Sequence, residues 1–200
     1  MEIVIPFKPV NPKTRLSGIL TREEREELAF NLLLDVVDAC GEAVVISSAE
    51  DRRLEGLRYE VDSRSLDEVV TSRIKKGDLA VVMSDLPLLN ERVVERFLSS
   101  DGEVVLAPGR KGGTNMLLSR SRSFRTSYHY GSFVKHVQIC ESLGLKYKIF
   151  DSFYASVDID DESDLLELMI HGKGKRSYEY LEGLGFYVDF SEKDPMLKRS

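Results

Sequence analysis

Short apolar runs alternate with amphipathic stretches along almost the whole chain. The apolar runs predict buried strands over Ile3 to Phe7, Ala43 to Ile46, Leu79 to Met83, Val104 to Ala107 and Tyr147 to Phe150. Helical periodicity fills the segments between them, from Thr21 to Gly41, Ser65 to Lys75, Glu91 to Leu98, Ser132 to Leu143 and Asp161 to Ile170. This alternation predicts an α/β protein, a three-layer α/β/α sandwich with a mostly parallel sheet.

The first helix carries the clearest boundary signals. Thr21-Arg22-Glu23-Glu24 forms a capping box, and Gly41 stops the pattern. Two segments, residues 108–115 and 120–131, lack periodicity and predict irregular loops, which in a compact domain are usually functional or mobile. The last thirty residues predict a helix and a strand that cover the sheet.

Length and composition indicate one domain spanning residues 1–200. The chain has 200 residues and 42% hydrophobic content, enough to bury a sizeable core. Its net charge of -6 argues against a broad electropositive surface for nucleic acid, so we expect no nucleic-acid partner. It shows neither a bilayer-length apolar run nor a signal peptide at its N-terminus, so we expect a soluble, cytoplasmic protein with no membrane partner. Cys40 and Cys140 lie too far apart for a metal or redox motif and predict reduced, buried thiols.

An aspartate stands directly after the third predicted strand. In Met83-Ser84-Asp85-Leu86-Pro87 an apolar run ends in a carboxylate, at the strand end where open α/β sheets bind ligands. Asp85 is therefore a candidate metal ligand. The alternative is structural: an aspartate before a turn commonly forms an Asx turn or caps a helix, here the one that opens at Asn90 or Glu91.

A basic loop follows the first predicted strand. Residues 6–16 contain three prolines and the cations Lys8, Lys13 and Arg15, at a sheet edge where phosphates are often held. No Walker sequence is present, so side-chain cations would replace a glycine cradle. The alternative is a solvated basic loop.

A second acidic group lies in residues 157–161. Extended backbone would place Asp158 and Asp160 on one face, with Ile159 turned away, and two adjacent carboxylates need a cation between them. The alternative for Asp160 is a helix N-cap. Together with Asp85, this pair would form an all-oxygen site that suits Mg²⁺. His136 lies beside core-like residues and predicts a half-buried packing residue rather than a catalytic base.

Five motifs, in order along the chain, resemble the archaeal 2-phospho-L-lactate guanylyltransferases of coenzyme F(420) biosynthesis, which look like distant relatives of sugar-nucleotide and cytidylyl transferases. The motifs are Ile5-Pro6-Phe7-Lys8-Pro9 with Lys13-Thr14-Arg15-Leu16-Ser17, Ser84-Asp85-Leu86-Pro87-Leu88-Leu89, Ala107-Pro108 with Gly112-Gly113-Thr114-Asn115, Gly131-Ser132-Phe133 with His136, and Asp158-Ile159-Asp160.

The resemblance implies a nucleotidyltransferase fold (nucleotide-diphospho-sugar transferase-like) with a mixed sheet, GTP as donor, a small phosphorylated carboxylic acid as acceptor, and a homodimer. It implies the following roles: Mg²⁺ ligands Asp85, Asp158 and Asp160; catalytic Lys13 and Arg15; nucleotide contacts Phe7, Lys8, Lys13, Arg15 and Asp67; acceptor contacts Thr114, Asn115, Gly131 and Ser132. Asp67 stands where the family usually has asparagine, and His129 where it more often has glycine, so the guanine and acceptor contacts there are open.

Three alternatives remain at this stage. The acceptor could be phosphoenolpyruvate or 3-phosphoglycerate, which differ little from 2-phospho-L-lactate. The domain could bind a nucleotide without turnover. A weaker third alternative is single-stranded nucleic-acid binding through Arg120, Arg122 and Arg125.

Overall fold

The computed structural model describes residues 1–191 and 193–200 and is built on a seven-stranded sheet. In chain order the main strands are β1 (Glu2–Phe7), β2 (Val44–Ser47), β3 (Tyr59–Val61), β4 (Leu79–Val82), β5 (Val104–Pro108), β6 (Thr114–Ser119) and β7 (Tyr147–Ile149). Their order in the sheet is β3-β2-β1-β4-β6-β5-β7, and every neighbouring pair is parallel except the two that β6 makes with β4 and β5. The predicted mostly parallel sheet is confirmed.

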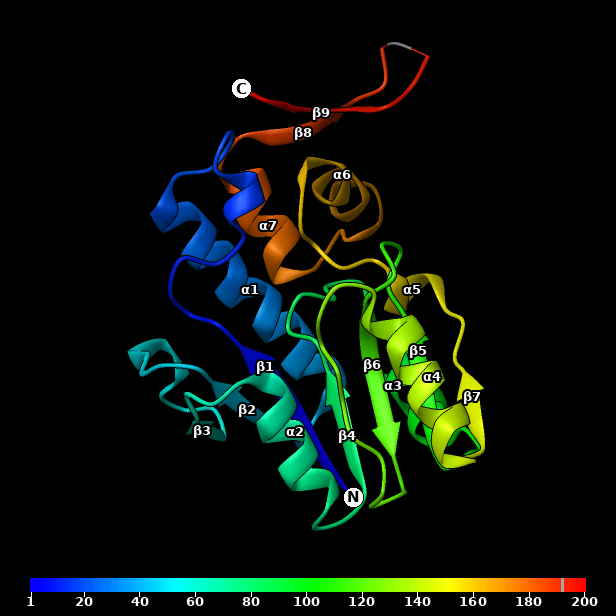
Figure 1. The fold of residues 1–200 in the computed structure, drawn as a ribbon. Coiled ribbons are helices and arrows are strands. Elements are labelled where there is room, and N and C mark those ends of the chain that lie inside the picture. Colours follow the sequence, from blue (N-terminus) through cyan, green and yellow to red (C-terminus); the bar gives the residue numbers. More distant parts are fainter. Residues whose placement is uncertain (192) are drawn as a thin grey trace.

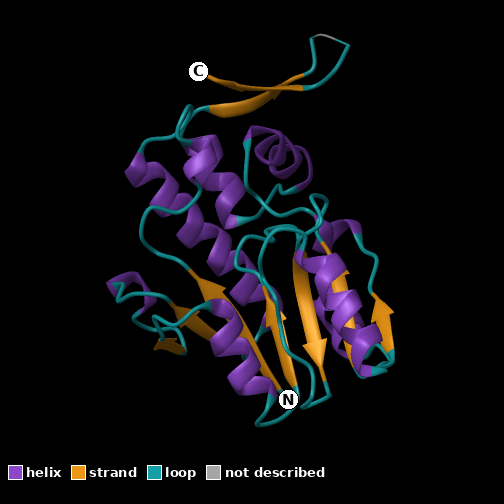
Figure 2. Cartoon of the chain, viewed as in Figure 1, coloured by secondary structure: helices purple, strands orange, loops and turns teal. Residues whose placement is uncertain are grey.

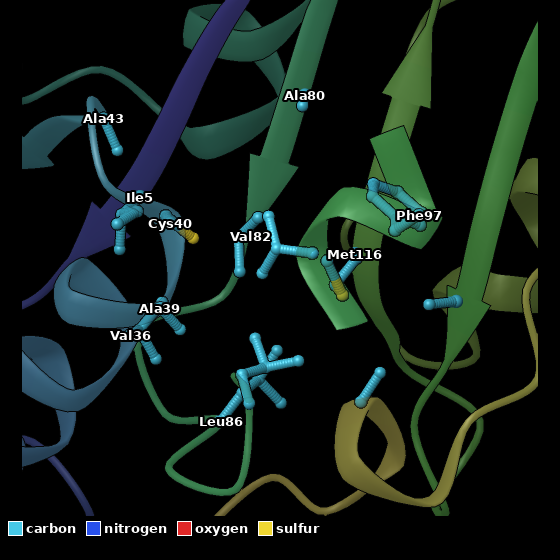
Figure 3. Packing of buried hydrophobic residues seen from close by; sticks show 14 of the residues in the cluster. Ile5, Val36, Ala39, Cys40, Ala43, Ala80, Val82, Leu86, Phe97 and Met116 are labelled. Carbon is cyan, nitrogen blue, oxygen red and sulfur yellow. The ribbon is translucent and has the colours of Figure 1, made fainter. Parts of the chain in front are cut away.

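Helices cover both faces of this sheet (Figure 2). On one face α1 (Arg22–Cys40) and α3 (Glu91–Leu98) share a buried cluster with side chains of β1, β4 and β6, and on the other α2 (Leu66–Ile74) and α4 (Ser132–Leu143) share a second. Figure 3 shows the first cluster, in which Val36, Cys40 and Phe97 pack onto Ile5, Val82 and Met116. The three-layer architecture is therefore confirmed.

Two strands of the seven-stranded sheet, β6 and β3, have no counterpart in the prediction. All six residues of β6 are buried, but Thr114, Asn115 and Ser119 interrupt its apolar pattern, so its start was assigned to an irregular loop. β3 has three half-buried or exposed residues at the sheet edge and gives no apolar run. Polar residues in a central strand such as β6, which is hydrogen-bonded to a strand on each side, interrupt the apolar run by which a buried strand is recognised.

The C-terminal part forms an addition beside the sheet rather than a cover on it. After α5 (Phe153–Ser156) come α6 (Glu162–His171), α7 (Arg176–Gly183) and a hairpin of β8 (Phe186–Asp189) and β9 (Met196–Arg199). Helix α7 packs on α1, and the hairpin lies beyond α6 and α7, away from the sheet (Figure 1). The expectation of a strand covering the sheet was wrong because α1 has a second apolar face, directed away from the sheet. On that face Leu28 and Leu32 form a third buried cluster with α6 and α7.

Cys40 and Cys140 are buried free thiols, as predicted. Burial raises the pKa of the Cys40 thiol to about 12, so its nucleophilic thiolate form is suppressed. Among the helices of the described residues, none combines the length and the apolar character needed to cross a membrane.

Candidate functional site

The carboxyl ends of the parallel strands face the loops that connect the sheet to the C-terminal helices (Figure 1). A pocket of about 470 Å³ opens at this edge, next to β1, β2 and β4. Its lining includes Phe7, Lys8 and Lys13 from the first loop and Asp85 from the loop after β4. An apolar pocket with converging charged groups at this edge is the expected position of a ligand site in an open α/β fold.

Lys13 connects the two acidic segments at the mouth of this pocket. Its Nζ atom lies 2.5 Å from Oδ2 of Asp85 and 3.4 Å from Oδ1 of Asp160, while Arg15 Nη1 lies 3.2 Å from Oδ2 of Asp160. Burial of Lys13 would lower its pKa, but the charges of Asp85 and Asp160 together outweigh burial and raise it. Lys13 is therefore a fixed positive charge at neutral pH.

Asp158 has different hydrogen-bond partners from Asp160. It is half-buried, and its Oδ1 accepts a hydrogen bond from Asn115 Nδ2 at 3.2 Å. Burial raises the pKa of the Asp158 carboxyl, and the nearby charge of Asp85 raises it further. The segment is held by a bond from Ile159 N to the Asp85 carbonyl (3.1 Å), and the Ile159 side chain is fully buried, as the alternation predicted.

These donors fit the Mg²⁺ that the sequence predicts, although they form no closed cage. Within residues 1–191 and 193–200, no three His, Cys, Asp or Glu side chains converge closely enough to hold a metal ion. Mg²⁺ in nucleotide enzymes is usually held by one or two carboxylates together with waters and substrate phosphates. Burial, and next the charge of Asp85, raise the pKa of Asp158, and a divalent cation beside these carboxylates would offset both effects.

The raised pKa of Asp158 predicts a stability gain on its neutralisation. A carboxyl with a higher pKa in the folded state binds its proton more tightly there, so stability falls as pH rises from the ordinary aspartate pKa through the raised value. We expect Asp158→Asn to raise the Tm of the metal-free protein at pH 7 by about 2 °C or more, and to have a smaller effect below the ordinary aspartate range. Thermal denaturation monitored by circular dichroism at both pH values measures this.

Asp161 provides the matched control, because its pKa is shifted in the opposite direction from that of Asp158. A hydrogen bond from Lys111, supplemented by one from Ser163, lowers the pKa of the Asp161 carboxyl. Asp161→Asn should therefore leave the Tm at pH 7 unchanged or lower it. A Tm that falls in both variants would contradict the assignment of Asp158 as an under-neutralised carboxylate.

The first loop is held in a restricted conformation by helix α1. Asn11 and Lys13 both have positive φ, of 46° and 52°, which non-glycine residues adopt infrequently. Arg25, 6% exposed, donates to the Pro12 carbonyl at 2.6 Å and to Asn11 Oδ1 at 3.1 Å. Glu26 accepts a bond from the Asn11 backbone N–H at 3.1 Å. Two neighbouring side chains of α1 thus fix the loop that carries Lys13.

Removing this clamp should affect both stability and turnover. We expect Arg25→Met to lower the free energy of unfolding by about 1.5–3 kcal/mol, since a charged donor to buried oxygens is lost. Turnover should fall at least about tenfold, because a small misplacement of a charged group is costly in an active site. Urea denaturation and steady-state kinetics measure the two effects. Arg176→Met is the control: the Arg176 side chain is 54% exposed and pairs with Asp38 rather than with the first loop, and its loss should change neither quantity beyond error.

Two of the four predicted acceptor residues, Thr114 and Ser132, form a buried hydrogen-bonded group at the start of β6 and α4. Thr114 N donates to Ser132 Oγ at 2.9 Å, and Ser132 Oγ lies 3.3 Å from Thr114 Oγ1. His136 is fully buried rather than half-buried: its Nε2 accepts from Ser127 N at 2.9 Å, which leaves the proton on Nδ1 to donate to Thr114 Oγ1 at 2.9 Å. Burial lowers the pKa of His136 to about 4, so it stays neutral and orients Thr114.

The structure gives other predicted residues local roles. Asp67 Oδ1 accepts a bond from Tyr128 N at 2.8 Å, and its other oxygen lies 3.6 Å from His129 Nε2, so Asp67 anchors the 120–131 loop. Gly131 has a φ of 67° directly before α4. Arg120 donates to the Gly102 and Leu98 carbonyls, which removes it from the surface proposed for nucleic acid.

The pocket also contains residues that the sequence did not single out. Asp62 and Arg64 line it beyond β3, and Ser48 lines it beyond β2. The sequence also contained a signal for the buried position of Arg25, the residue that holds the first loop. Arg25 precedes Leu28 and Leu32 at helical spacing and so falls on an apolar face of α1. For Asp62 the signal was weak, because β3 is too short to mark a strand end.

Comparison with known proteins identifies the family of the chain. The family model described as "Guanylyl transferase CofC like" matches residues 1–199. A protein of Ferroglobus placidus named 2-phospho-L-lactate guanylyltransferase is 70% identical over 200 residues, covering 100% of both chains, and one of the same name from Archaeoglobus fulgidus is 57% identical over 100% of this chain and 97% of its own.

Among solved structures, a protein from Desulfovibrio desulfuricans G20 assigned to the nucleotide-diphospho-sugar transferases superposes with a TM-score of 0.72 at 15% identity, covering 92% of this chain and 95% of its own. At that identity the likeness concerns the fold, and it confirms the predicted fold class. The match over the whole length and the close relatives decide the family. The chain belongs to the CofC-like guanylyl transferase family.

Proposed function

We propose that the protein transfers the guanylyl group of GTP to the phosphate of 2-phospho-L-lactate, giving lactyl-2-diphospho-5'-guanosine and pyrophosphate for coenzyme F(420) biosynthesis. The names of its full-length relatives support this activity. The observation that carries it is the position of Lys13, which lines the 470 Å³ pocket and pairs with both Asp85 and Asp160.

The chemistry requires charge neutralisation more than proton transfer. A phosphomonoester has a second pKa of about 6 and is already an anionic nucleophile near neutral pH. One of its oxygens forms a bond to the α-phosphorus of GTP, while the bond from that phosphorus to the bridging oxygen breaks and pyrophosphate leaves. No general base is needed, and repulsion between anions is the main barrier.

The residues of the site address this repulsion. Lys13, buried and kept protonated by its carboxylate neighbours, would stabilise charge on the transferred phosphate, and the more exposed Arg15 would stabilise the departing pyrophosphate. Thr114 and Ser132, oriented by His136, would bind the acceptor with Asn115 and Gly131, and Phe7 and Lys8 would contact the nucleotide. Asp85, Asp158 and Asp160 would hold Mg²⁺, which when bound supplies Lewis-acid neutralisation of the phosphates.

Pyrophosphate release tests this proposal. Purified protein is incubated with GTP, Mg²⁺ and one acceptor at a time: 2-phospho-L-lactate, phosphoenolpyruvate or 3-phosphoglycerate. We expect the fastest release with 2-phospho-L-lactate and none without an acceptor. Faster release with another acid would change the acceptor, and silence with all three would contradict the enzyme and favour a nucleotide-binding domain without turnover.

We also propose that the protein is a cytoplasmic homodimer. Around the β8–β9 hairpin, an apolar groove of about 310 Å³ includes Met169 and Phe186, and Phe190 beside them is 69% exposed. Exposed apolar patches of this kind mark interaction sites. Light scattering should give twice the 22.7-kDa mass of one chain; the mass of a single chain would contradict the dimer.

A further inference from the structure

Part of the lining of the 470 Å³ pocket differs in chemistry from the cations assigned to the phosphates. Its walls there are apolar, from Phe7, Ile46, Leu66 and Val69. Two charged residues, Asp62 and Arg64, interrupt this apolar lining. A flat heterocycle between apolar walls, read by a few fixed polar groups at its edge, is the ligand that such a lining favours.

Asp62 is held in place by the backbone. Its own N–H donates to the Ser47 carbonyl of β2 at 2.9 Å, and its Oδ1 accepts from the Arg64 backbone N–H at 3.1 Å. The Arg64 side chain, and then this backbone bond, lower the pKa of Asp62 to about 2, so the carboxylate is charged under all relevant conditions. Asp62 is therefore a pre-positioned acceptor whose orientation does not depend on a flexible side chain.

Arg64 adds a donor next to these acceptors. Its Nη2 lies 2.7 Å from Asp62 Oδ2 and its Nε 3.0 Å from Oδ1, but its side chain is 53% exposed. Ion pairs with this exposure are weak, so the guanidinium can leave the carboxylate oxygens at little cost while the backbone bond stays. Arg64 then offers a guanidinium N–H donor beside the two acceptor oxygens of the Asp62 carboxylate.

This arrangement of one donor and two acceptors complements the Watson–Crick edge of guanine. Guanine presents an acceptor, O6, followed by two donors, N1–H and N2–H₂, whereas adenine presents a donor at position 6 and a bare acceptor at N1. We propose that Asp62 accepts from N1–H and N2–H₂ of guanine and that Arg64 donates to O6, so that these two residues select GTP over ATP. The inference rests on the proposed use of GTP and adds the residues that recognise its base.

The test compares three nucleotides that differ at this edge. ITP keeps O6 and N1–H but lacks the 2-amino group, and ATP reverses both polarities. Calorimetric titration with GTP, ITP and ATP, in Mg²⁺ and without acceptor, should show the wild type binding GTP most tightly. Asp62→Asn should weaken GTP binding about 10- to 100-fold and abolish the preference for GTP over ITP.

Two further variants complete the design. Arg64→Met, at a half-exposed position that the fold tolerates, should weaken GTP and ITP alike and keep the preference between them. Glu60→Gln removes a carboxylate two positions before Asp62 that pairs with Arg73 outside the pocket lining, and it should bind all three nucleotides as the wild type does.

The outcomes separate this inference from the proposed function. An Asp62→Asn protein that retains the wild-type preference for GTP over ITP, or a wild type that binds ATP as tightly as GTP, would overturn the base-recognition role. A protein with the expected base preference that releases no pyrophosphate with any acceptor would support the base site and contradict the proposed reaction.

Discussion

Asp85→Asn is expected to lower kcat for pyrophosphate release by at least about 1,000-fold, equivalent to about 4 kcal/mol of transition-state stabilisation. Asp85 lies in the loop after β4, pairs with Lys13 and is close enough to Asp158 to raise the pKa of that carboxyl. An amide keeps the shape of the side chain but provides neither the charge that Mg²⁺ requires nor the partner that orients Lys13. Steady-state kinetics at several Mg²⁺ concentrations measure the loss.

Folding should be retained, because the Asp85 side chain is 23% exposed and belongs to no buried apolar cluster. Asp38→Asn is the matched control: its carboxylate is 61% exposed on α1, pairs with Arg176, and should leave kcat within about twofold. Circular dichroism should give similar melting curves for both variants. Unchanged turnover in Asp85→Asn would remove Asp85 from the site.

The fold was predictable because hydrophobic periodicity reports burial directly. Strands β1, β2, β4 and β5 are nearly continuous apolar runs, and α1 carries a capping box that the structure reproduces at Thr21 and Glu24. Strand β6 was not predicted because three of its six buried residues are polar. The C-terminal hairpin was misplaced because local pattern does not specify which surface an apolar face contacts, and here α1 offered a second face.

The site residues were predictable where they follow the end of a recognisable strand. Carboxyl ends of parallel strands share one edge, so Lys13 and Asp85, in the loops after β1 and β4, had to lie near each other once these two strands were recognised. Asp160 lies between α5 and α6, so no strand end places it. Contacts that depend on a loop's path were not predictable in this way. Asn11 and Lys13 have positive φ in a loop whose Asn11 and Pro12 are held by Arg25 and Glu26, and no spacing rule predicts these hydrogen bonds.

Lys13→Met is expected to have two effects of opposite direction. Turnover should fall about 100- to 1,000-fold, because a buried, permanently charged group that faces the phosphates is lost. Metal binding by the nucleotide-free protein should instead become stronger. In the wild type, Nζ of Lys13 lies against Asp85 and Asp160, where it competes with a cation for the same oxygens. Without it, the carboxylates repel one another and attract a divalent ion more strongly.

Calorimetric titration of nucleotide-free protein with Mg²⁺ or Mn²⁺ separates this competition from a general loss of structure, which would weaken binding. We expect affinity to rise at least about tenfold in Lys13→Met and to stay unchanged in Lys76→Met, which removes an exposed lysine beyond the end of α2. Equal or weaker metal binding in Lys13→Met would contradict a shared lysine and metal site. A rise accompanied by lost turnover would mean that Lys13 holds the carboxylates ready in the free protein and turns to the phosphates once nucleotide and metal arrive together.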